Sequence, residues 1–148
     1  MASIILIILI LFGFFAYKEM NDYTNIIKLN WWIEIPKEIK YQEIYSKDSW
    51  ESFHWDWIRY HIYFYENEEA VDKMLDWENS LSDDQDSNWG YFEHLEERLL
   101  VELKIEWENF PPLAQISNVY YKKHEDNSEI LILLNDIQKK LYVIESFL

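Results

Sequence analysis

The C-terminal stretch VYYKKHEDNSEILILLNDIQKKLYVIES, residues 119–146, decides the fold. Polar residues divide it into three apolar or alternating runs, residues 119–123, 130–134 and 141–146. Short polar connections between runs of this length are typical of antiparallel hairpins. The middle run is continuously apolar, which is typical of a central strand covered on both faces. The stretch therefore predicts a three-stranded antiparallel meander.

Two further strands are predicted upstream, a short one at residues 41–45 and a longer one from Trp55 to Tyr65. The longer run alternates, and its two faces are Ile58, Tyr60, Ile62 and Phe64 on one side and Trp57, Arg59, His61, Tyr63 and Tyr65 on the other. Alternation predicts one face on the core and a second, wetter aromatic face. The second face could bind a ligand by stacking, or belong to the core if Trp107 and Phe110 cover it.

Two helices are predicted between the upstream strands and the meander. Asn67 can cap a helix that begins at Glu68 and ends near Trp77. Asn88 can cap a second helix, in which four apolar residues share one face: Phe92, Leu95, Leu99 and Leu103. Residues 99–107 also alternate like a strand, but their dense glutamates favour the helix. The pattern as a whole predicts an α+β domain with an antiparallel sheet and two helices.

The N-terminal residues 1–17 contain no charged side chain and are apolar almost throughout. About seventeen helical residues is the lower limit for crossing a bilayer, and Tyr17 and Lys18 can extend the usable length at the interface. We therefore predict a single-pass transmembrane helix with a helical extension, residues 1–28, followed by an acidic domain, residues 29–148. A cleaved secretory signal is the alternative, but the run lacks a preceding basic region and a good cleavage site.

The charge of the chain is strongly negative, with a formal net charge of −15. Residues 66–108 hold fifteen Asp and Glu against three Lys and Arg, which leaves −12 on this stretch. Nucleic-acid binding needs a basic face, so we expect no nucleic-acid partner. The acidic stretch is either a solvated helical surface or a surface that docks a basic protein. The candidate partner-binding residues are Asp83, Asp84, Glu93, Glu96, Glu97 and Trp57.

The candidates for catalysis or metal binding are Asp48, His54 and Asp56, with His61 and His94 as further possible ligands. His54 and Asp56 are two residues apart and would share a face of a strand, where a carboxylate can orient an imidazole base or help bind a divalent metal. No known catalytic motif accompanies them. With no cysteine, disulfides and thiolate chemistry are excluded. We therefore expect a hydrogen-bonded turn, no cofactor and no enzymatic activity.

Four segments carry a family resemblance: DSWESFHWD at residues 48–56, WENFPPL at 107–113, Tyr120-Tyr121, and LYVIE at 141–145. In this order they resemble a group of small, mostly uncharacterised, exported or membrane-anchored proteins of Firmicutes. Those proteins have a turn similar to D-x-H-G-G-F-H-G-D-G, a Trp before Leu-Pro-Leu, a Tyr-Tyr strand and a closing Leu-Tyr-Tyr-Tyr-Glu strand. The resemblance covers about residues 40–148, with a longer helical insert here.

The chain departs from that family where the glycines of the turn would stand, because bulkier residues replace them: Trp50, Glu51, Ser52, Trp55 and Trp57. Any role that needs close backbone approach is therefore not carried over. The resemblance implies a fold and export from the cytoplasm, but no activity. Lys18 and Lys28 follow the apolar run, and by the positive-inside rule they favour a domain that stays in the cytoplasm.

The function expected from these observations is that of a membrane-tethered, non-enzymatic interaction domain at the bacterial cell envelope, with the domain outside the cytoplasm. The first alternative is an immunity or antitoxin-like protein whose acidic helical surface neutralises a basic partner. The second is a metal-assisted hydrolase that uses His54 and Asp56.

Overall fold

The computed structural model describes residues 7, 8, 10, 13, 23–48, 57–77, 97 and 99–147, and the chain forms two compact units, residues 1–36 and 37–148. In the first unit, α2 (Tyr23–Trp31) buries Tyr23, Ile27 and Trp31, which are four residues apart and share one face. The helix continues past the predicted end at Lys28. Within the described parts of the chain, no helix has the length and apolar character needed to cross a membrane.

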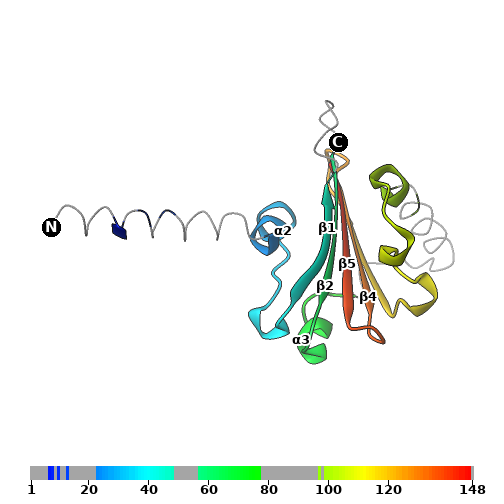
Figure 1. Ribbon diagram of the computed structural model, residues 1–148, viewed down its shortest axis with the longest axis horizontal. Coiled ribbons are helices and arrows are strands. Elements are labelled where there is room, and N and C mark those ends of the chain that lie inside the picture. The colour runs from blue at the N-terminus through cyan, green and yellow to red at the C-terminus, as the bar shows by residue number, and fades with distance from the viewer. Residues whose placement is uncertain are drawn as a thin grey trace. The chain divides into compact units, whose positions relative to one another are not determined.

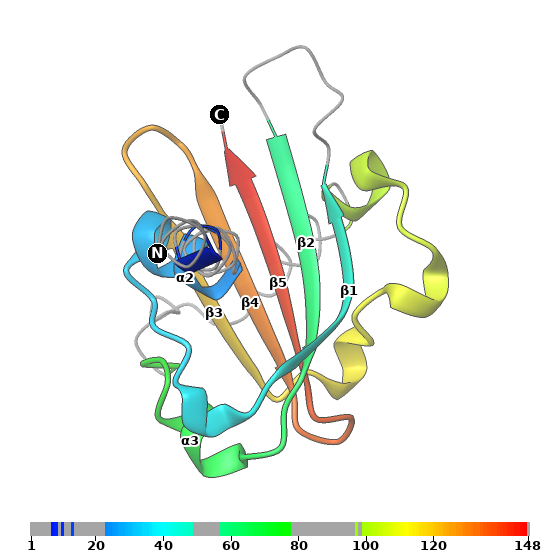
Figure 2. The same ribbon diagram turned by 60° about the vertical axis from the view of Figure 1, so that its left-hand side comes forward.

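The second unit is built on a five-stranded antiparallel sheet in the order β1-β2-β5-β4-β3 (Figures 1 and 2). Its strands are β1 (Gln42–Asp48), β2 (Trp57–Phe64), β3 (Asn118–Lys123), β4 (Glu129–Asn135) and β5 (Lys140–Phe147). The C-terminal meander is confirmed, and so are the two upstream strands. Every residue of β4 is buried, as its continuous apolar run predicts. The chain is therefore a small α+β domain.

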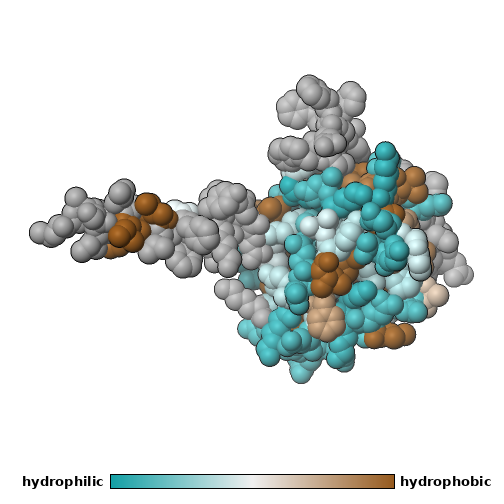
Figure 3. Space-filling model, viewed as in Figure 1, coloured by the Kyte–Doolittle hydropathy of each residue, from teal (hydrophilic) through white to brown (hydrophobic). Residues whose placement is uncertain are grey.

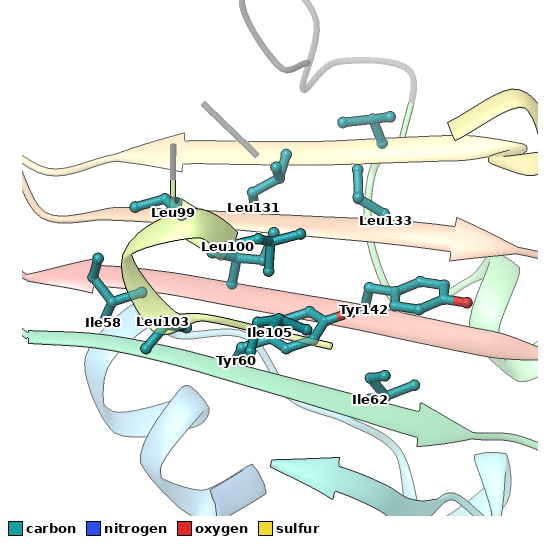
Figure 4. Close-up of a cluster of buried hydrophobic side chains, with 12 residues drawn as sticks. Ile58, Tyr60, Ile62, Leu99, Leu100, Leu103, Ile105, Leu131, Leu133 and Tyr142 are labelled. Atoms are coloured by element: carbon teal, nitrogen blue, oxygen red, sulfur yellow. The ribbon is translucent and has the colours of Figure 1, made fainter. Parts of the chain in front are cut away.

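One face of the sheet carries the main hydrophobic cluster (Figure 4). Its members are Ile58, Tyr60, Ile62, Val119, Leu131, Leu133, Tyr142 and Ile144 from the sheet, with Leu99, Leu100, Leu103 and Ile105 packed over them. Residues 99–103 are helical, so the helical alternative for this region is confirmed over the strand. Lys104 ends the helix with a φ of 52°, and the Ile105 N–H bonds to the Leu100 carbonyl at 3.2 Å.

Three short 3-10 turns accompany the sheet, η1 (Lys37–Ile39), η2 (Trp107–Asn109) and η3 (Leu113–Gln115). The yellow-green segment that contains η2 and η3 lies along one side of the sheet in Figure 2. On the face of the molecule seen in Figure 3, hydrophilic residues cover most of the described surface and hydrophobic residues form small patches between them.

The second face of β2 is half-buried at Trp57 and Arg59 and buried from His61 onward, so the prediction of a wetter aromatic face is wrong for the later part of the strand. His61, Tyr63 and Tyr65 are buried, whereas Phe64 is exposed. The rings of Tyr63 and Tyr41 are T-shaped, with 5.4 Å between their centroids. The Tyr65 hydroxyl donates a hydrogen bond to Asp136 at 3.2 Å. Tyrosine can bury its ring while its hydroxyl finds a polar partner, which an alternation of residue types does not reveal.

Trp107 and Phe110, whose cover would have made this face part of the core, do not cover it. Trp107 is exposed, and Phe110 packs against the main hydrophobic cluster on the opposite side of the sheet.

The helix α3 (Glu68–Asp72) begins where the sequence predicts, because the Asn67 side chain accepts a hydrogen bond from the Ala70 N–H at 3.2 Å. It ends at Asp72, so the predicted end near Trp77 is wrong. The Val71 carbonyl accepts hydrogen bonds from the Met74 N–H at 3.0 Å and from the Trp77 indole at 3.3 Å. These bonds take the place of the next helical hydrogen bond and turn the chain.

Candidate functional site

A group of polar side chains lies on β1, β2 and β5, on the face opposite the main hydrophobic cluster. Arg59, His61 and Tyr63 alternate along β2 and therefore share this face. In the antiparallel register, Arg59 lies opposite Asp48 of β1 on one side and opposite Glu145 of β5 on the other. Residues directly opposite in adjacent strands have neighbouring side chains. We call Asp48, Arg59 and Glu145 the charged row.

The charged row runs from the surface into the interior. Asp48 is exposed, Arg59 is half-buried and Glu145 is fully buried. The Arg59 guanidinium lies 3.9 Å from the centroid of the Trp57 ring, which itself packs against Phe147 at 5.0 Å. A buried carboxylate is expensive without an opposite charge, and the register places Arg59 directly opposite Glu145.

A histidine–carboxylate pair lies next to the charged row. The β1–β2 register shifts between Glu43 and Tyr45, so that Glu43 lies opposite Tyr63 and Tyr45 lies opposite Ile62. Glu43 is a diagonal neighbour of His61 on this face, and its carboxylate lies 2.5 Å from Nδ1 of His61. The His61 ring also stacks on Tyr63, with 6.1 Å between the ring centroids.

Burial lowers the pKa of His61 below its ordinary value, although the Glu43 and Asp48 carboxylates act in the opposite direction. The ring is therefore neutral near pH 7, and its Nδ1–H donates to Glu43, since a carboxylate can only accept. An imidazole oriented in this way can serve as a general base. His61 is only 6% exposed, however, so it presents little surface to a substrate. The geometry suits a structural pair better than a catalytic one.

Only part of the predicted catalytic or metal site can be placed. Asp48 ends β1 and lies opposite Arg59. His54 and Asp56 lie outside the described residues, as does His94, so their combination with Asp48 stays a prediction. Among the residues that the structure does describe, no group of three or more His, Cys, Asp or Glu side chains is arranged to hold a metal ion.

The predicted partner-binding residues are placed in part as well. Asp83, Asp84, Glu93 and Glu96 lie outside the described residues. Glu97 is helical and exposed, two residues before the helical residues 99–103. Trp57 is half-buried, with its ring engaged by Arg59 and Phe147, so it offers less surface to a partner than its position in the sequence indicated.

Sequence reasoning missed Glu43, Arg59 and Glu145 as members of this site. The alternation of β2 already placed Arg59 beside His61 on one face. Glu43 and Glu145 come from strands far apart in the sequence, and only the register of both strands against β2 shows that they meet it. The irregularity after Glu43 leaves no signal in residue type.

A second polar surface covers the outer side of residues 97–108. Its exposed acids are Glu97, Glu102, Glu106 and Glu108. The segment is tied to the sheet by hydrogen bonds from the Tyr45 hydroxyl to Glu106 at 3.1 Å and from Lys47 Nζ to the Lys104 carbonyl at 2.8 Å. Hydrogen bonds from its own backbone and from Tyr45 lower the pKa of Glu106, which keeps it charged.

The fold and these groups define a small acidic α+β domain with an antiparallel five-stranded sheet. No family model matches the chain, and neither a curated protein nor a solved structure matches it. The resemblance to exported or membrane-anchored Firmicutes proteins stays a prediction, and function has to be argued from the residues themselves.

Proposed function

We propose that this chain is a membrane-tethered, non-enzymatic interaction domain at the bacterial cell envelope. The observation that carries the proposal is the uncharged apolar run of residues 1–17, which an acidic sheet domain follows in the sequence. Within this run Ile7, Ile8 and Ile10 are helical, and each is more than half exposed. Exposed aliphatic side chains are unfavourable in water, and a bilayer would cover them.

The polar groups of the sheet support a non-enzymatic role. His61 is bonded to Glu43 and buried, and Arg59 stacks on Trp57 between two acidic residues. These contacts suit structural roles for His61 and Arg59. The exposed acids of residues 97–108 are instead open to solvent, where they favour approach of a basic protein.

The same acidic surface supports a second candidate, an immunity-like protein that neutralises a basic toxin. The two candidates differ in the partner, which is a resident envelope protein in the first and an attacking protein in the second. Survival of cells that express a basic envelope-directed toxin, with and without this chain, separates them. Protection that the chain confers would favour the immunity role.

The interaction role is tested by cross-linking the full chain in its own membrane. We expect the double variant Glu97→Lys/Glu108→Lys to lose the cross-linked neighbours of the wild-type chain. The matched control Glu38→Lys/Glu125→Lys reverses two exposed acids elsewhere and should keep them. Neighbours that survive equally in both variants would contradict the acidic docking surface, and a wild-type chain with no neighbours would contradict the interaction role.

The side of the membrane is tested by fusing alkaline phosphatase after residue 148, because this enzyme is active only outside the cytoplasm. We expect activity, and an inactive fusion would contradict the envelope assignment.

The hydrolase alternative is tested with the double variant His54→Ala/Asp56→Ala. This alternative predicts that the variant loses the phenotype that the wild-type chain confers on cells, whereas the interaction role predicts that the phenotype is retained.

A further inference from the structure

Trp32 occupies an unfavourable backbone position at the end of α2. Its φ is 59°, and its N–H donates to the Lys28 carbonyl at 3.0 Å, which closes the helix. Glycine adopts this left-handed conformation at little cost, but a bulky aromatic residue rarely does. The Trp32 residue is nevertheless 87% exposed, so most of its surface faces solvent.

A second large exposed apolar residue lies close to it in the sequence. Leu29, in the last turn of α2, is 77% exposed and is the third residue before Trp32. The buried positions of α2, Tyr23, Ile27 and Trp31, form a different stripe. We call Leu29 and Trp32 the Leu29–Trp32 patch. An exposed pair of this kind, held in place at the cost of backbone strain, points to contact with something outside the chain.

The length of the chain limits what that contact can be. Residues 18–22 connect the apolar run to α2, and an extended chain advances about 3.5 Å per residue, so α2 begins within about 20 Å of the end of the run. The nine residues of α2 rise about 14 Å. If residues 1–17 span a bilayer, the patch is held within about 35 Å of its surface.

We propose that the Leu29–Trp32 patch rests in the headgroup–acyl boundary of the bilayer in which the chain is anchored. This inference depends on the membrane tether of the proposed function. Tryptophan is enriched at this boundary because its ring is apolar and its indole N–H can bond to headgroups. Lys28, one residue before Leu29, is exposed and pairs with Glu34 at 3.0 Å, and a lysine near a membrane surface can extend its ammonium to lipid phosphate. The contact would hold α2 at the membrane surface.

The absence of cysteine from the chain allows single labels to be placed without background. Four variants of the full chain are made, Ile8→Cys, Leu29→Cys, Trp32→Cys and Ile137→Cys. Each is labelled with an NBD fluorophore and reconstituted into phosphatidylcholine vesicles that contain doxyl-labelled phosphatidylcholine. Ile137 is exposed in the turn between β4 and β5 and serves as the water-facing control.

We expect the labels at positions 29 and 32 to emit at shorter wavelength than the label at 137, and to be quenched by a shallow doxyl group. The label at position 8 should be quenched by a deep one. If position 8 is quenched while 29 and 32 match 137, the patch does not touch lipid and the tether stands. If position 8 is not quenched, the tether fails and the patch contact fails with it.

The Trp32→Cys variant removes the indole that is proposed to contact lipid. A second measurement therefore keeps the label at position 29 and varies the residue at position 32. The Leu29→Cys label is compared in the Trp32→Gly and Trp32→Phe backgrounds. Glycine relieves the backbone strain and should therefore preserve the helix end, yet we expect it to reduce quenching at position 29 at least twofold. Trp32→Phe keeps an aromatic ring and should retain most of the quenching at position 29. Equal quenching in both backgrounds would overturn the role of Trp32.

Discussion

The charged row gives a quantitative prediction for Arg59→Met. Methionine keeps much of the aliphatic volume but leaves the fully buried Glu145 opposite a neutral residue. Removing one partner of a buried charge pair costs about 3–5 kcal/mol. Arg59 is only half-buried, so we expect the lower end, about 3 kcal/mol. Glu145→Gln leaves Arg59 opposite Asp48 and should cost less, about 1–3 kcal/mol.

The double variant decides whether the two residues act together. We expect Arg59→Met/Glu145→Gln to cost less than the sum of the single variants by about 2 kcal/mol. The assay is urea unfolding of the full chain in detergent micelles, followed by circular dichroism. Lys73→Met, which removes one member of the exposed Lys73–Glu69 pair, is the control and should change stability little. An additive double variant, or a cost below about 1 kcal/mol for Arg59→Met, would refute the reasoning.

Three further predictions use the same unfolding assay. Leu133→Ala opens a cavity in the main hydrophobic cluster and should cost about 2–5 kcal/mol; a change below about 1 kcal/mol would mean that the cluster is not tightly packed. Asn67→Ala removes the cap of α3 and should cost about 1 kcal/mol, whereas Asn67→Asp should retain most of that stability; equal effects would argue against the cap. Because burial lowers the pKa of His61, the unfolded chain binds this proton at a higher pH than the folded chain, so stability falls as the pH drops below about 6.5. His61→Gln should remove that part of the loss between about pH 7 and pH 5, and an identical loss in both proteins would contradict it.

The strands were predictable because they are set by local pattern. The apolar run at 130–134 identified a central strand, and the polar turns around it identified the meander. The alternation of β2 identified which of its residues face the main hydrophobic cluster. The start of α3 was predictable for the same reason, since Asn67 caps a residue only three positions away.

The features that sequence reasoning missed depend on contacts between distant segments. The end of α3 is set by the Trp77 indole reaching back to the Val71 carbonyl. The pairing of Glu43 with His61 depends on the register of β1 against β2, and the place of Glu145 depends on which edge of the meander β2 joins. The buried state of Tyr63 could not be predicted because tyrosine suits a wet face and a covered one equally.

The membrane tether is tested most directly by alkaline extraction of membranes from cells that make the full chain. Ile8→Lys/Ile10→Lys places two charges within the apolar run, and a lysine near the centre of a membrane helix costs about 2.5–3.5 kcal/mol. We predict that the wild-type chain and the control Ile137→Lys stay in the membrane pellet, and that the double variant moves to the supernatant. A wild-type chain in the supernatant, or a double variant that pellets as completely as the wild type, would contradict the account.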